Sequence, residues 1–121
     1  MSKNLLNNNI EERTEKRLSI SEMLLNYGYF NEAVIFSWMA LRETLFLSLE
    51  KLKIPYQSTT EAIFRFIENQ IYEAHIKNII FLYHLGIMAE WDRNLKIDEK
   101  DAFDIYEKSK QICEHIIKNF T

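Results

Sequence analysis

The sequence predicts an all-α protein: a single domain over residues 1–121, folded as a four- to five-helix up-and-down antiparallel bundle. Two observations carry this prediction. Glycine and proline punctuate secondary structure strongly, and the chain holds only Gly28, Gly86 and Pro55. No segment alternates apolar and polar residues with the period of two that a half-buried strand requires, and no internal repeat recurs.

The first two predicted helices meet at a glycine. The first is expected over about residues 4–27, with Gly28 as a left-handed cap at its C-terminal end. The second begins near residues 29–31 and ends before Pro55, because proline disfavours helical geometry in the preceding Ile54.

Capping signals place the other three helices. Ser58 and Glu61 form an S-x-x-E capping box that opens a short third helix, ending near residue 69. A fourth helix is expected over roughly residues 71–91. The fifth opens at Asp98, whose side chain is suited to cap a helix N-terminus, and runs to the end of the chain.

The fifth helix has the clearest buried face. Its apolar and small residues follow the three-four spacing of an amphipathic helix: Ala102, Phe103, Ile105, Tyr106, Ser109, Ile112, Cys113, Ile116 and Phe120. By contrast, the second helix is apolar on nearly every face, so it is either central to the core or shared with a partner chain. We predict a homodimer whose interface takes residues from this helix, namely Ile35, Trp38, Met39 and Phe46.

Composition limits the classes of function. Lys plus Arg number 15 against 18 Asp plus Glu, a net charge of −3, which argues against wide non-specific nucleic-acid binding but not against a small local site. Cys113 is the only cysteine, so no internal disulfide forms and a reducing compartment is expected. The N-terminal residues lack the apolar stretch of a signal peptide, and no apolar run is long enough to span a membrane. We expect a soluble cytoplasmic protein.

No cofactor or metal site is expected. Cys113 and His115, two residues apart on a helix, point about 200° apart and cannot hold one metal together. The sequence also contains no phosphate-binding loop, zinc-ligand spacing or nucleophile elbow.

The helix order and two local motifs resemble the HEPN superfamily of small helical bundles. A long first helix is followed by YGYFNEAVIFSWMALRETLFLSLEKL, and the pair Arg93-Asn94 precedes the last helix. The resemblance implies an HEPN-like bundle. Catalytic members are metal-independent ribonucleases that work as dimers with a motif of arginine, four to six residues and histidine. Other members are non-catalytic, and some pair with small nucleotidyltransferases in toxin–antitoxin systems.

The histidine of that motif is missing. Asp98, Glu99 and Lys100 occupy the positions that would hold it. Cleavage of RNA by its own 2′-hydroxyl needs a group that moves protons near neutral pH, and histidine is the side chain suited to this. Within one chain, no other histidine is expected to reach Arg93, because helical spacing separates His84, His75 and His115 from that region by about 13, 27 and 25 Å.

Each candidate residue also has a purely structural explanation. Arg93 and Asn94 either retain a ligand site or close the fourth helix. Arg42 and Glu43 either form a core or intersubunit ion pair, which we favour, or a polar patch beside Arg93. His84 shares a helix face with apolar residues, so we expect it to be packed.

The sequence therefore favours a non-catalytic HEPN-like module that binds a protein partner, a nucleotide or RNA through a pocket near Arg93. The candidate binding residues are Arg93, Asn94, Arg42 and Glu43. A metal-independent ribonuclease with an atypical active site and a plain helical interaction subunit remain the alternatives.

Overall fold

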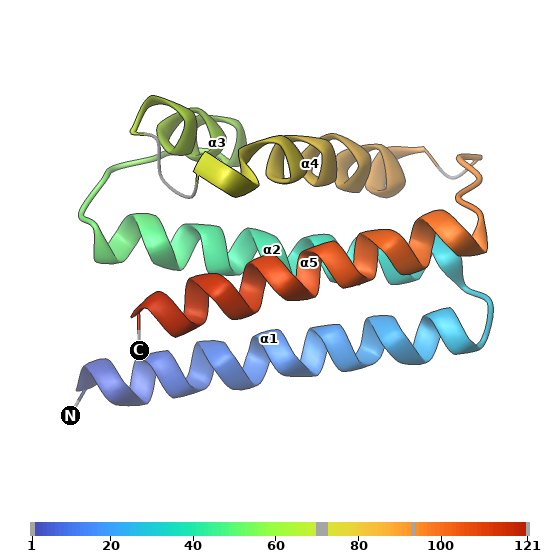
Figure 1. The fold of residues 1–121 in the computed structure, drawn as a ribbon, viewed down its shortest axis with the longest axis horizontal. Helices are drawn as coiled ribbons and strands as arrows, with labels where there is room; N and C mark the ends of the chain where they lie inside the picture. The colour runs from blue at the N-terminus through green and yellow to red at the C-terminus, as the bar shows by residue number, and fades with distance from the viewer. Residues whose placement is uncertain (1, 70–72, 93, 121) are drawn as a thin grey trace.

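The computed structural model is helical throughout its ordered elements (Figure 1). It describes the backbone of residues 2–69, 73–92 and 94–120, and the side chains of residues 11–69, 73–92 and 94–119. Within these residues there is no strand. The five α-helices are α1 (Ser2–Asn26), α2 (Phe30–Lys51), α3 (Thr59–Glu68), α4 (Ile76–Trp91) and α5 (Glu99–Phe120), and a 3₁₀ turn, η1 (Glu73–His75), leads into α4.

Helices α2 and α5 lie side by side in the middle of the molecule (Figure 1). Helix α1 packs on one side of this pair, α4 covers α2 on the other side, and α3 lies in the connection between α2 and α4. The long helices α1, α2, α4 and α5 alternate in direction along the chain. The all-helical class and the up-and-down order thus follow the prediction.

Helix α2 contacts all four other helices, which explains why its sequence is apolar on nearly every face. Trp38 is only 1% exposed, packs against the ring of Tyr83 at 5.6 Å between centroids, and lies under Gly86 of α4. A Cβ atom added to Gly86 would lie 2.7 Å from the Trp38 Cβ. The placement of Trp38 at a dimer interface was therefore wrong: its ring is enclosed within the chain.

The other three predicted interface residues of α2 are half-buried. Ile35 and Phe46 pack against the core, and the Phe46 ring stacks on Tyr56 with centroids 4.8 Å apart. Met39 is also half-buried. Their proposed contact with a second chain stays a prediction.

Two helices end in the same left-handed turn. After α1, Gly28 has a φ of 84°, Gly28 N donates to Leu25 O, and Tyr29 N donates to Leu24 O. After α2, Lys53 has a φ of 59° and Ile54 N donates to Leu49 O. Both are Schellman motifs. The cap at Gly28 was predicted; the one at Lys53 was not, because lysine carries no turn signal.

The capping box of α3 is confirmed, since Glu61 N donates to Ser58 Oγ at 3.1 Å. The Glu61 carboxylate reaches back to accept from Gln57 N at 3.1 Å. The predicted start of the fourth helix near residue 71 was too early: α4 begins at Ile76, and η1 precedes it. Residues 70–72 lie outside the described chain.

Helix α5 begins as expected, because Asp101 N donates to Asp98 Oδ1 at 2.8 Å. Its predicted stripe is buried except for the half-buried Phe103, and the side chain of Phe120 is outside the described set. In the part of the chain that the structure describes, none of the helices combines the length and apolar character needed to cross a membrane.

Candidate functional site

The loop after α4 is the site that the sequence singled out. Arg93 itself lies outside the described residues, but its neighbours are exposed and well placed by hydrogen bonds. Asp92 ends α4 in an extended conformation, and its N–H donates to Met88 O at 2.8 Å. Asn94 N donates to Asp92 Oδ1 at 2.9 Å. Asp92 therefore closes α4 and turns the chain.

An asparagine at the start of α2 holds this loop from the other side. Asn31 Oδ1 accepts from Ile97 N at 3.2 Å, and Asn31 Nδ2 donates to Leu95 O. One amide side chain thus forms hydrogen bonds with two backbone groups of the loop, since it offers both an acceptor and a donor. Asn31 lies in the segment YGYFNEAVIFSWMALRETLFLSLEKL on which the HEPN resemblance rests. No sequence pattern indicated that its side chain would bind this loop.

Arg42 and Glu43 do not form a site together. Arg42 Nη1 lies 3.7 Å from Glu90 Oε1 on α4. Glu43 instead contacts α1, where it pairs with Arg13 at 2.6 Å and with Arg17. The adjacent residues thus point to different neighbours, as ion pairs within one chain.

One histidine differs from the prediction, because His84 is exposed and not packed. His75 and His115 come together with ring centroids 5.0 Å apart, and His115 Nε2 lies 3.0 Å from Asn119 Nδ2. Among the described residues no group of three His, Cys, Asp or Glu side chains is placed to hold a metal ion.

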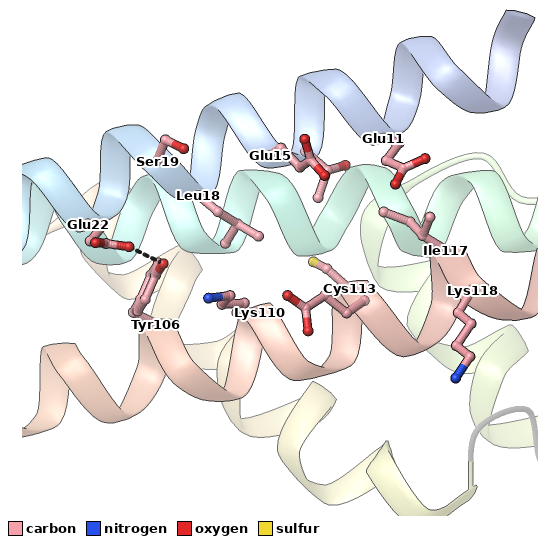
Figure 2. Close-up of a pocket in the computed structure, with 12 residues that line it drawn as sticks. Glu11, Glu15, Leu18, Ser19, Glu22, Tyr106, Lys110, Cys113, Ile117 and Lys118 are labelled. Carbon is pink, nitrogen blue, oxygen red and sulfur yellow. Dashed lines mark hydrogen bonds between the residues drawn. The ribbon is translucent and has the colours of Figure 1, made fainter.

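A groove with a volume of about 580 Å³ lies between α1 and α5 (Figure 2). Leu18, Cys113 and Ile117 give it apolar lining, and Tyr106 contributes a ring. This volume is within the usual range for small-molecule sites. Sequence reasoning missed the groove, because it is formed by two helices nearly a hundred residues apart.

Two groups in the groove titrate abnormally. Burial raises the pKa of the Cys113 thiol to about 12, so the thiol is neutral at physiological pH and is no nucleophile. Burial, and next the hydrogen bond to Glu22, raise the pKa of the Tyr106 hydroxyl well above its usual value. That hydroxyl donates to Glu22 Oε2 at 2.7 Å (Figure 2). Neither group is poised to exchange protons near neutrality, so the groove is suited to binding.

Charges lie along both edges of the groove. Figure 2 shows Glu11, Glu15 and Glu22 along α1, facing the side of α5 that carries Lys110 and Lys118. Lys110 Nζ lies 6.0 Å from the centroid of the Tyr106 ring, and the Lys118 side chain extends away from α1. The edge formed by α1 is therefore acidic.

Large apolar side chains are exposed on α3 and α4, and together they are called the apolar surface of these helices: Phe64 (57% exposed), Ile67 (39%), Ile80 (41%), Phe81 (50%) and Trp91 (82%). Nearly complete exposure of a tryptophan is unusual for a folded chain. Exposed apolar patches of this kind often mark sites of protein interaction.

Comparison of the chain with protein-family models, with characterised proteins and with solved structures finds no match. The resemblance to HEPN domains therefore rests on the residues quoted for it and stays a prediction.

Proposed function

We propose that the chain is a non-catalytic, HEPN-like helical module that self-associates through the outer face of α4 and serves as a protein-interaction unit. The observation that carries this proposal is the apolar surface on α3 and α4. Fully accessible aromatic side chains contribute about 150–250 Å² each, and an ordinary interface buries roughly 800 Å² per partner. Phe64, Phe81 and Trp91, with two isoleucines, supply much of such an area.

The pattern along α4 supports a second copy as the partner. Ile80, His84, Ile87 and Trp91 recur at intervals of four, three and four residues, so they share one side of the helix. This spacing is nearly symmetric about its centre. In an antiparallel pair of α4 helices, Ile80 of one chain would lie opposite Trp91 of the other, and His84 opposite Ile87, as a two-fold interface requires.

The loop that contains Arg93 favours a protein partner over RNA or a nucleotide. The described loop residues 92 and 94–98 carry the charged side chains of Asp92, Lys96 and Asp98, and Glu32 of α2 lines the same hollow as Lys96. Three carboxylates against one ammonium make a poor setting for phosphate, which proteins hold with arginine, lysine and backbone N–H groups. Asp98 is also engaged as a helix cap and is not available as a base.

Light scattering tests the proposal. We expect a dimer at micromolar concentration, and we expect the double variant Ile80→Lys/Trp91→Arg to be a folded monomer, because unpaired charges in an apolar interface oppose association. Met23→Lys is the matched control: Met23 is 50% exposed, on α1. A wild-type monomer, or a double variant that remains dimeric, would refute the proposed interface.

A further inference from the structure

The groove between α1 and α5 is long and narrow. Its lining runs from Glu11 to Glu22 on α1 and from Tyr106 to Lys118 on α5, which at the rise of an α-helix is about 16–18 Å along each axis. A volume of about 580 Å³ spread over this length suits an extended chain rather than a globular ligand. Leu18, Cys113 and Ile117 supply apolar contacts for methylene groups.

The carboxylates of α1 are spread along this length. Glu11 and Glu15 are one helical turn apart, and Glu22 follows two turns later. Glu22 is held by Tyr106. In the described part of the chain no hydrogen bond or ion pair engages the carboxylates of Glu11 or Glu15, since Arg13 and Arg17 turn toward Glu43. Two acceptors are therefore available to a ligand.

A buried hydroxyl gives an independent sign of a missing partner. Thr14 is 1% exposed and belongs to the lining of the groove. Its Oγ1 has no hydrogen-bond partner among the described residues. Buried polar atoms are nearly always hydrogen-bonded in folded proteins, and a hydroxyl can accept from an N–H donor.

We propose that this groove binds a linear aliphatic polyamine, with its ammonium groups near Glu11, Glu15 and Thr14 and its methylene segments on the apolar lining. An ammonium group is a pure hydrogen-bond donor, which matches carboxylates and an unpartnered hydroxyl. No three described carboxylates, histidines or cysteines are close enough to share a metal ion. Charges distributed along a flexible chain fit these separated acceptors, whereas one compact cation does not.

Titration calorimetry with spermine on the full chain tests the proposal. We expect saturable binding of one spermine per chain, weaker binding of the shorter putrescine, and loss of affinity as salt rises, because salt screens exposed charges. The double variant Glu11→Gln/Glu15→Gln should bind roughly tenfold more weakly, since each exposed ion pair contributes about two- to fivefold. Thr14→Val, which keeps the shape of the side chain, should also weaken binding.

The matched control is Glu12→Gln/Glu107→Gln. It removes the same charge from the same two-helix region, but neither residue lines the groove and both are exposed. Its affinity for spermine should equal that of the wild type. Equal weakening in both double variants would mean diffuse attraction to a negative protein and would overturn the site. Absence of saturable binding, or equally strong competition by Mg²⁺ at the same charge concentration, would overturn it as well.

Discussion

Lys53 is held in a conformation that suits glycine. Among the described non-glycine residues it alone has a positive φ, 59°, and it occupies the position in the turn after α2 that Gly28 occupies after α1. The left-handed region costs a non-glycine residue about 1–2 kcal/mol. Glycine avoids this cost, but part of the gain is offset because glycine gives the unfolded chain more conformational freedom. Lys53→Gly should therefore raise the free energy of unfolding by about 0.5–1 kcal/mol. Urea denaturation measures this, and a Lys53→Ala variant as stable as Lys53→Gly would contradict the cause.

Thr14 and Thr44 are both buried threonines, but only one has partners. Thr44 Oγ1 donates to Leu41 O at 2.7 Å and lies 3.6 Å from Cys113 Sγ, whereas Thr14 Oγ1 has no partner among the described residues.

Replacing each with the isosteric valine should separate them. Thr44→Val should lower the free energy of unfolding by about 1 kcal/mol, whereas Thr14→Val should leave it unchanged or raise it slightly, because an unpaired buried polar group is itself costly. Thermal denaturation of the two variants side by side measures the difference. A loss in Thr14→Val as large as in Thr44→Val would show that the Thr14 hydroxyl has a partner in solution.

At the residue scale, the sequence predicted what depends on near neighbours. The caps at Gly28, Ser58 and Asp98 were foreseen, because each acts within three residues of itself. The hydrogen bonds of Asn31 with the backbone of Leu95 and Ile97 were not predicted, because these partners are more than sixty residues away in the sequence. The spacing of residues along a helix reveals which face is buried, and does not reveal which distant polar group will face it.

The elements show the same limit. The all-round apolar character of α2 required cover on every side, and both a central position and a dimer interface would have provided it. The contacts of α2 with α1, α3, α4 and α5 supply the cover within the chain. The apolar surface that is exposed lies instead on α3 and α4. The sequence did not distinguish the outward side of α4 from an inward one, because Ile80, Ile87 and Trp91 follow the same spacing as a buried stripe.

The crossing of α2 and α4 depends on one glycine. In an ordinary helix, Gly→Ala is stabilising by roughly 0.5–1 kcal/mol. At Gly86 the added Cβ would lie 2.7 Å from the Trp38 Cβ and 2.8 Å from Cδ1, well inside contact distance. Gly86→Ala should therefore destabilise the protein by about 1–3 kcal/mol, the usual cost of overpacking a core. The sign of the change in the urea midpoint decides between the two effects, and a stabilised variant would show that α4 can move off Trp38.

At the scale of the whole molecule, His75 and His115 lie away from the loop that holds Asp92 and Asn94. His75 pairs with His115 at the start of α4, and sixteen residues of helix separate it from Asp92, about 24 Å by helical rise. We therefore expect no metal-independent cleavage of single-stranded RNA near neutral pH, because a positioned acid or base contributes about a hundred- to ten-thousandfold to such a reaction. A labelled RNA incubated with repurified protein and with Arg93→Ala provides the measurement. Cleavage that disappears only in the variant would restore the ribonuclease alternative.

The pH dependence of stability should reflect three protons that the folded chain holds more tightly than the unfolded chain, those of the buried Tyr106 and Cys113 and of the half-buried Tyr56. Burial is the first cause that raises the pKa of Tyr56 to about 12, of the Cys113 thiol to about 12, and of Tyr106 well above its ordinary value. The unfolded chain loses these protons first, from about pH 9 upward, so in that range it binds fewer protons than the folded chain. The free energy of unfolding is therefore at its full value below about pH 9 and falls as pH rises toward 12, by up to about 1.4 kcal/mol per pH unit for each group.

Urea denaturation at successive alkaline pH values should show this slope. Tyr106→Phe should make the slope shallower, while Tyr29→Phe, which alters an exposed ring, should not. A slope that is the same in Tyr106→Phe as in the wild type would mean that the Tyr106 proton, and with it the hydrogen bond to Glu22 that joins α1 to α5, contributes nothing to the alkaline loss.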